Sequence, residues 1–308
     1  MTTIEEPSAS SRLPCRLFAI LAHEAPRAVI LRRGPSKWVQ AILWHTDDDT
    51  FEYGQWFHGH IYERRCDLSP DGVLFIYFAS KITGRTLRDP EYTYAWTAIS
   101  KPPYLTALAL WPKGDTWDGG GLFRGRRTVV LNHDPAHMAS HPAHRPRGLK
   151  VLPWPGAEGD WPRGENGPVY GERLKRDGWR LAKKGAWPPF PISSRRRRWE
   201  AEQPTVWQKV HPSGRYRLRW TLRAYDFGRL GGTEVSDFAI EADEPGTRVP
   251  LVGATWAEWD QRGRLVFARE GQLYATSATE PRDEAIMRAD FNDQRPYDLP
   301  APDWARTW

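Results

Sequence analysis

The chain has 308 residues, of which 40% are hydrophobic, and this composition excludes a polypeptide that is disordered throughout. Its mean hydropathy is −0.67 and it contains no long apolar run, which excludes a membrane-spanning helix of about 20 apolar residues. The net charge is +6, but residues 121–223 carry 22 Lys or Arg against 8 Asp or Glu, so the positive charge is concentrated in the middle of the chain.

The first 14 residues include two acids and no apolar stretch, so we expect residues 1–14 to form a disordered tail without a secretory signal. Residues 15–308 are then the folded domain. Cys15 and Cys66 are the only cysteines, too few for a disulfide framework. We expect both thiols to be small buried groups, and this cysteine usage favours a cytoplasmic protein.

Most of the chain is predicted to form short β-strands, because apolar residues alternate with polar ones or form short continuous runs. Short helices are expected only at Pro135–Ser140 and Arg282–Ala289. The predicted strands are Arg16–Ala22, Ala28–Arg32, Trp38–Trp44, His60–Asp67, Val73–Ser80, Thr93–Ile99, Tyr104–Trp111, Thr128–Leu131, Pro168–Leu174, Tyr216–Leu222, Val235–Ile240, Thr255–Trp259, Arg264–Ala268 and Gln272–Thr276.

A repeat of about 47 residues runs through these strands. A turn that ends on glycine and leads into a strand recurs at Gly72, Gly120, Gly167, Gly214 and Gly263. Such turns use Asp, Asn or Ser early and glycine where φ is positive. A period of 40–50 residues with several strands in each unit is typical of a β-propeller. The sequence therefore predicts an all-β fold, a single β-propeller.

The blade count depends on the two irregular parts of the chain. Three strands precede the first clear repeat; they predict either a further blade or a strand that completes the last blade and closes the ring. Residues 134–194 are rich in Pro and Gly and predict long loops around one degraded blade. We expect five to six blades, with five preferred.

Several segments resemble known sequences. The segment SPDG-VLFIYF resembles the SPDG-type strand repeat of bacterial propellers, and WAEWDQRGRLVFAREGQLYA is similar to a degenerate copy of it. The segments SKWVQAILWHTDDDTFEYGQWFHGHIYERRCDLSPDG and ADFNDQRPYDLPAPDWA resemble a family of uncharacterised bacterial proteins. This resemblance implies a propeller fold and no particular activity.

A dense polar cluster lies at residues 52–67. If His60–Asp67 is one strand, Glu63, Arg65 and Asp67 share one face, and the opposite face also carries charge. We favour a buried Arg–carboxylate pair that ties neighbouring blades together; the alternative is a strand that lines a central channel. A second polar cluster follows at residues 172–180, where Arg176–Trp179 reads as a hairpin turn. The candidate residues for a channel lining are Trp56, Glu63, Arg65, Asp67 and Arg173.

The basic middle of the chain contains a run of four arginines between aromatic residues. Arginine for phosphates and aromatics for bases would suit a polyanion such as nucleic acid, although a solvated loop accounts for the run more simply. The candidate residues for polyanion binding are Arg195, Arg196, Arg197 and Arg198.

Four histidines, His133, His137, His141 and His144, crowd one segment, with the first three spaced by four residues. On a helix they would share a face and suit zinc, but Pro135 interrupts any such helix. We therefore predict an irregular exposed loop, no metal site and no cofactor.

No nucleophile elbow, phosphate-binding loop, dinucleotide fingerprint or zinc-protease motif is present in the sequence. The leading hypothesis is a monomeric, non-catalytic propeller that binds or scaffolds a protein partner. One alternative is an enzyme that acts on a carbohydrate or other polar small molecule in the central channel. A second alternative is binding of nucleic acid or another polyanion through residues 121–223.

Overall fold

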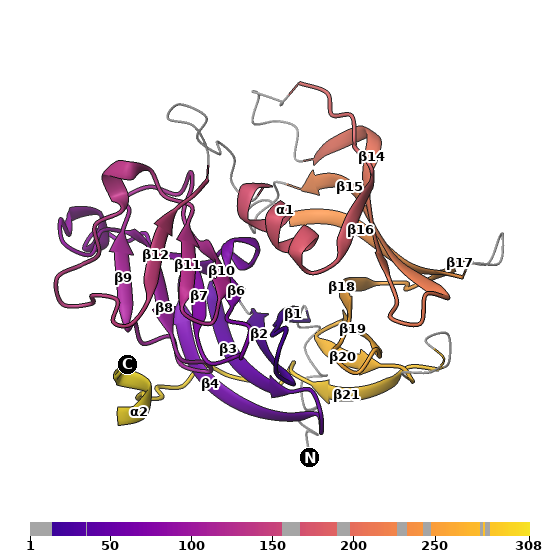
Figure 1. The fold of residues 1–308 in the computed structure, drawn as a ribbon, viewed down its shortest axis with the longest axis horizontal. Helices are drawn as coiled ribbons and strands as arrows, with labels where there is room; N and C mark the ends of the chain where they lie inside the picture. The colour runs from indigo at the N-terminus through magenta and orange to yellow at the C-terminus, as the bar shows by residue number, and fades with distance from the viewer. Residues whose placement is uncertain are drawn as a thin grey trace, which may run out of the picture.

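A computed structural model describes residues 14–34, 36–155, 167–189, 198–226, 233–242, 248–277, 280 and 284–308. The predicted tail and Arg195–Arg197 lie outside these residues, apart from Pro14. The described chain is mainly β-structure in five sheets, which confirms the all-β prediction (Figure 1). Within the described residues, none of the helices has the length and apolar character needed to cross a bilayer.

The first sheet is antiparallel and is formed by the N-terminal strands in chain order. Its last strand was not predicted, because TFEYGQWFH is exposed at several positions and lacks a clean apolar pattern. The sheet is complete in itself, and within the described chain none of its strands pairs with the last sheet, so the expectation of a strand completing the last blade is wrong. Its strands are β1 (Arg16–Leu21), β2 (Arg27–Arg33), β3 (Trp38–His45) and β4 (Thr50–His58).

The second sheet contains β5 (His60–Ile61), β6 (Asp67–Leu68), β7 (Phe75–Ser80), β8 (Ala95–Ser100) and β9 (Ala109–Pro112). The prediction of one continuous strand over His60–Asp67 is wrong. The segment is interrupted by a 3-10 turn, η1 (Glu63–Arg65), so its side chains do not alternate between two faces. The short helical turn η2 (Thr86–Arg88) lies between β7 and β8.

The third sheet joins β10 (Gly121–Gly125), β11 (Thr128–Leu131) and β12 (Lys150–Pro153), and β12 runs parallel to β11. The histidine segment before β12 contains one 3-10 turn, η3 (Pro135–His137), where a short helix was expected.

A helix, α1 (Gly167–Arg176), follows the third sheet, so the prediction of a strand over Pro168–Leu174 is wrong. Val169, Arg173 and Leu174 are its buried residues, and this spacing places them on one helical face. The predicted hairpin turn at residues 176–179 is the end of this helix. Gly178 adopts a φ of 90° and donates its N–H to the Lys175 carbonyl, as glycines do after a helix.

The fourth sheet contains β13 (Trp179–Lys183), β14 (Arg198–Val210), β15 (Tyr216–Asp226), β16 (Thr233–Ala242) and β17 (Arg248–Pro250). All four pairings between consecutive strands are antiparallel. The strand β17 pairs with β16 along one side, and its three residues are exposed.

The fifth sheet contains β18 (Ala254–Trp259), β19 (Leu265–Arg269), β20 (Gln272–Ala275) and β21 (Ile286–Asp290). The expected helix at residues 282–289 is wrong where the chain is described, because β21 pairs with β20 there.

Three of the predicted turns share one geometry. Gly72, Gly214 and Gly263 have φ values of 71°, 78° and 77°. Each donates its N–H to the carbonyl of the residue three positions earlier: Ser69, His211 and Asp260, respectively. Two turns depart from this pattern. Gly120 packs so closely on Arg65 that a Cβ added to the glycine would lie 2.1 Å from the Arg65 carbonyl oxygen. Gly167 begins the helix α1.

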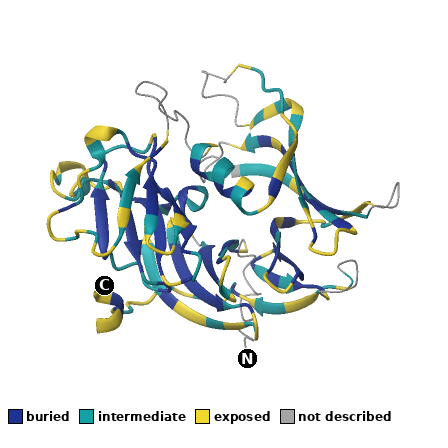
Figure 2. Cartoon of the chain, in the orientation of Figure 1, coloured by how far each residue is buried: buried dark blue, intermediate teal, exposed yellow. Residues whose placement is uncertain are grey.

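Each sheet contacts the next one in chain order. The strand β1 lies against β6 and β18, β10 lies against β6 and β7, and β16 lies against β18. The third sheet reaches the fourth through α1, which contacts β10 and β13. Hydrophobic clusters fill the spaces between neighbouring sheets, for example Trp44 with Trp256 between the first and fifth. Figure 2 shows buried residues concentrated on strands such as β2, β3 and β7, and exposed ones on β4 and β17.

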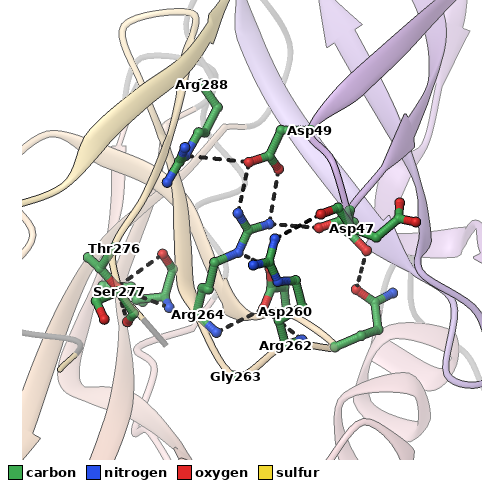
Figure 3. Close-up of polar contacts among 12 residues, drawn as sticks. Asp47, Asp49, Asp260, Arg262, Gly263, Arg264, Thr276, Ser277 and Arg288 are labelled. Carbon is green, nitrogen blue, oxygen red and sulfur yellow. Dashed lines mark hydrogen bonds and ion pairs between the residues drawn. The ribbon is translucent and has the colours of Figure 1, made fainter. Parts of the chain in front are cut away.

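A buried ion-pair cluster joins the first sheet to the fifth; we call Asp49, Asp260, Arg264 and Arg288 the Arg264 clasp (Figure 3). Arg264 is 4% exposed and donates to both carboxylate oxygens of Asp49, at 2.8 and 2.9 Å. It also donates to Asp260 at 2.7 Å, and Arg288 lies 3.4 Å from Asp49. The clasp therefore fixes the β3–β4 turn against β19 and β21.

The C-terminal segment returns from the fifth sheet to the first two (Figure 1). Arg32 of β2 donates from Nε to the Phe291 carbonyl at 2.9 Å and from Nη2 to the Asn292 and Gln294 carbonyls. Lys101 then donates to the Trp304 carbonyl at the end of the chain, in the helix α2 (Asp303–Arg306).

Candidate functional site

A cavity of about 1310 Å³ opens between the first, second, fourth and fifth sheets. It is bounded by β1, the segment from β5 to η1, the strands β16 and β17, and the start of β18. Its charged and histidine lining residues are Arg16, Arg33, His60, Glu63, Arg64, Arg223, Glu234, Asp237 and Arg248.

Three arginines and two glutamates meet inside this cavity; we call Arg16, Arg33, Glu63, Arg64 and Glu234 the cavity cluster. Arg33 lies 3.0 Å from Glu63, and Arg64 lies 3.4 Å from the same carboxylate. Arg64 also lies 2.7 Å from Glu234 of β16. One guanidinium therefore bridges a carboxylate of the second sheet and a carboxylate of the fourth.

The two carboxylates of the cavity cluster are perturbed in opposite directions. Burial would raise the pKa of Glu63, but Arg33 and Arg64 outweigh that effect and lower the pKa to about 2. Burial raises the pKa of Glu234 above its usual value, and the charge of Arg64 only partly offsets this shift. The Glu63 carboxylate is therefore ionised at neutral pH, while Glu234 holds its proton more readily than an ordinary glutamate.

The positive groups of the cavity also affect one another. Burial, followed by the charge of Arg33, lowers the pKa of Arg16. The same two causes lower the pKa of His60 to about 4, so its imidazole is neutral at physiological pH. The cavity cluster therefore carries more positive than negative charge.

An aromatic and guanidinium stack lies at the wall of this cavity; we call Phe18, Arg64, Tyr170 and Arg173 the central plug. The Arg64 guanidinium lies 5.6 Å from the Phe18 ring centre and 5.4 Å from that of Tyr170. Arg173 lies 5.4 and 5.0 Å from the same two rings. Phe18 also lines a smaller cavity of about 200 Å³, so the plug lies between the two cavities.

The structure places two of the predicted lining residues at these cavities. Glu63 lines the large one. Arg173 lines the small one; it donates to the Glu63 carbonyl at 3.2 Å and also to the Cys66 carbonyl. Arg173 thus holds the backbone that carries Glu63, from the α1 side.

The other three predicted lining residues lie at neither cavity. Asp67 is fully buried and pairs with Arg176 at 2.6 Å; this is an Arg–carboxylate pair as the sequence favoured, but its arginine comes from the helix α1 and not from a strand of another sheet. Arg65 is also fully buried, and it donates to two backbone carbonyls of residues 116–118. Trp56 lies on β4 with Arg32 over its ring at 5.1 Å. The turn η1 turns Arg65 and Asp67 away from the cavity, because it breaks the strand alternation that had aligned them with Glu63.

Of the four arginines predicted to bind a polyanion, Arg195, Arg196 and Arg197 lie outside the described residues. Arg198 begins β14, is exposed, and pairs with Glu200 at 3.0 Å. Beside it, Trp187 packs against Trp199 with ring centres 4.8 Å apart. Part of the aromatic environment of the arginine run is therefore used in packing.

The histidine segment is held by its neighbours. His133 is fully buried and contacts the Thr97 hydroxyl at 2.7 Å. His141 is also buried, where an exposed loop was expected, and it stacks on Tyr92 at 4.1 Å between ring centres. Throughout the described ranges, no three His, Cys, Asp or Glu residues are grouped so that they could hold a metal ion. Both cysteines are free and buried, which confirms that prediction.

Sequence reasoning missed Arg16, Arg33, Arg64 and Glu234 as site residues. Arg16 and Arg33 lie directly opposite each other on β1 and β2. Two like charges facing each other across a strand pair are unfavourable unless acidic groups lie nearby. That signal becomes visible only when the register of the two strands is known.

Comparison with known proteins adds no relative: no protein-family model and no curated protein matches this chain.

Proposed function

We propose that the protein is a non-catalytic binding module, a five-bladed β-propeller in the cytoplasm, and that its ligand is a segment of a protein partner that enters the large cavity. Five sheets in chain order, with contacts from each to the next and from the fifth to the first, support the propeller. The shared geometry of three glycine turns supports the resemblance to SPDG-type repeats.

The observation that carries the proposal is the size and wall of the cavity. About 1310 Å³ exceeds the roughly 300–1,000 Å³ typical of small-molecule sites. Part of the wall is β17, which has no strand partner on its outer side among the described residues. At the same wall Val252 is 74% exposed. An extended peptide can add to such an edge and place apolar side chains against it.

The ion pairs of the cavity support binding without catalysis. Glu63 is held by two arginines, and Glu234 is held by one of the same two. A carboxylate with a pKa of about 2 is a poor proton donor at neutral pH. The central plug also lies between the large cavity and the smaller one, which supports a cavity without an open channel through the molecule.

Site-specific photo-crosslinking tests the proposal. A photo-crosslinking amino acid replaces Val252 at the cavity mouth or, as a control, Ile82, which is 62% exposed and does not line the cavity. We expect position 252 to form a covalent adduct with one protein in cells, and position 82 to form none.

The partner identified in this way, once purified, should bind the wild type and lose affinity for Val252→Trp, which narrows the mouth, but not for Ile82→Trp. Identical adducts from both positions, or equal binding of the two Trp variants, would reject the cavity as the binding site.

A second candidate is hydrolysis of a carbohydrate. Glu63 and Glu234 share Arg64, and their pKa values are shifted in opposite directions, as in pairs that divide acid and base roles. Cleavage of an aryl glycoside that is lost in Glu234→Gln would favour this function over simple binding.

A further inference from the structure

The charge of the large cavity specifies the chemistry of its ligand. Among the described residues, its wall carries five arginines, Arg16, Arg33, Arg64, Arg223 and Arg248, and three acids, Glu63, Glu234 and Asp237. The surplus of positive charge lies partly in a buried region, where charges interact more strongly than they do in bulk water. An anionic group entering the cavity would therefore be attracted and would offset the mutual repulsion of the arginines.

Arg33 is oriented to bind such a group. Its side chain is 16% exposed, and Nη2 makes its contacts with Glu63, His60 and the Ile61 carbonyl. Among the described residues, its Nε and Nη1 atoms make no hydrogen bond. Either of these atoms can donate a charge-assisted hydrogen bond to a carboxylate, and such bonds are stronger than those between neutral groups.

Arginines at the mouth of the cavity can also bind acidic groups of a ligand. Arg248 of β17 is exposed, and no described residue forms an ion pair with it. Arg223 pairs with Asp237, and both side chains are about half exposed. Positive charge therefore extends from the inner cavity cluster to the outer edge strand.

We infer that the segment that enters the cavity is acidic and extended, with one carboxylate on Arg33 and further acidic side chains near Arg248. This inference rests on the proposed function. The cavity also offers apolar surface at Leu251, Val252 and Phe238, which suits a peptide in which acidic and apolar side chains alternate.

Nucleic acid fits this cavity less well. A nucleic acid strand carries a phosphate at every nucleotide, and Glu63, Glu234 and Asp237 would lie near some of those charges. A peptide can place acidic side chains only where arginines lie, and its backbone can hydrogen-bond with the exposed edge of β17.

Fluorescence anisotropy with labelled decapeptides tests the inference. The probe alternates Glu and Val, and its controls alternate Gln and Val or Lys and Val. We expect the Glu–Val peptide to bind more tightly than both controls, and its affinity to fall as salt is added. Arg33→Gln should weaken binding about tenfold or more, because a charge-assisted hydrogen bond to the peptide is lost.

Two further variants keep the result interpretable. Arg33 pairs with Glu63, so its loss can also affect folding; Arg248 is exposed and forms no such pair with a described residue. Arg248→Gln should weaken binding by roughly twofold to fivefold, as expected for a surface ion pair. Lys183→Gln removes an exposed charge from β13, away from the cavity, and should leave binding unchanged.

Each unfavourable outcome has a separate meaning. Equal binding of the Glu–Val and Gln–Val peptides would overturn the acidic ligand, while a partner crosslinked at position 252 would still support the proposed function. A labelled 15-nucleotide oligothymidylate that binds more tightly than the Glu–Val peptide, and is weakened by Arg33→Gln, would assign the cavity to nucleic acid and overturn the inference.

Discussion

His133 shows how a residue first considered as a metal ligand serves the fold. Its ring lies between Thr97 and the His137 carbonyl, with no exposed surface. Burial lowers its pKa from the usual 6.5 to about 4, although the contact with the His137 carbonyl acts in the opposite direction. The folded protein therefore holds this imidazole neutral at a pH where an unfolded chain would protonate it.

The free energy of unfolding should consequently depend on His133 at mildly acidic pH. Stability from the neutral ring is fully present above pH 6.5 and is lost as the pH falls toward 4, by about 3 kcal/mol in total. Urea unfolding of the wild type at a series of pH values should show this loss, and His133→Gln should show a shallower slope.

His60 has the same direction of shift, so the variant should keep part of the slope. Ile82→Gln supplies the control, because it changes an exposed side chain without a titratable group and should leave the slope as in the wild type. Parallel slopes for the wild type and His133→Gln would contradict the assignment.

At the scale of elements, the glycine turns respond differently to substitution although they share one geometry. In the turn at Gly214, an added Cβ would meet nothing within 4 Å, whereas at Gly72 it would lie 2.9 Å from the Cβ of Arg27. The two positions therefore separate the effect of backbone conformation from the effect of crowding.

Gly214→Ala should lower the free energy of unfolding by about 1–2 kcal/mol, the usual penalty for a left-handed alanine. Gly72→Ala should lower it by roughly 1–3 kcal/mol more, because the new methyl group is forced against Arg27. Equilibrium urea unfolding of both variants measures the difference. Equal losses would show that the Arg27 side chain moves aside freely.

The elements also show where sequence reasoning succeeds. Buried strands such as β2 and β7 were predicted because each contains a short continuous apolar run. The strand β4 was missed because most of its residues are exposed or half-buried, so its sequence shows neither a continuous apolar run nor a clean alternation. The helix α1 was mistaken for a strand because its buried face includes Arg173, which a hydrophobic pattern does not count.

The candidate site was predicted only in part for a related reason. Glu63 was singled out because charged residues surround it in the sequence. Arg33 and Glu234 lie on β2 and β16, and only the folded chain brings them to one cavity. Local pattern therefore identified Glu63 alone, the turn η1 places Arg64 beside it, and the contacts between sheets bring Arg33 and Glu234 to the same cavity.

For the whole molecule, the Arg264 clasp joins the first sheet to the last. Arg264→Leu would leave Asp49 and Asp260 without their main cation, and such breakage of a buried pair typically costs about 3–5 kcal/mol. Thermal and urea unfolding should show a loss of this size. Arg262→Ala, an exposed arginine in the same turn, should change stability by less than about 0.5–1 kcal/mol.

A double variant checks the physical cause. Asp49→Asn combined with Arg264→Leu should be less destabilising than the sum of the two single changes, because the neutral amide no longer needs a cation. Strict additivity would show that the clasp stabilises the molecule by packing and not by charge.

Because Arg32 donates to the C-terminal segment, some of its native contacts can form only late in biosynthesis. Arg32 precedes its acceptor at Phe291 by 259 residues. At roughly 5–20 residues per second, a ribosome makes that acceptor about 13–50 s after Arg32 itself. Throughout this interval the guanidinium lacks its acceptors in the C-terminal segment, and the first sheet lacks the Phe291 ring that packs into its core. The strands β1 and β2 are therefore made first but are among the last to complete their native packing. In the nascent chain, part of their apolar surface is covered only when the C-terminal segment has been made.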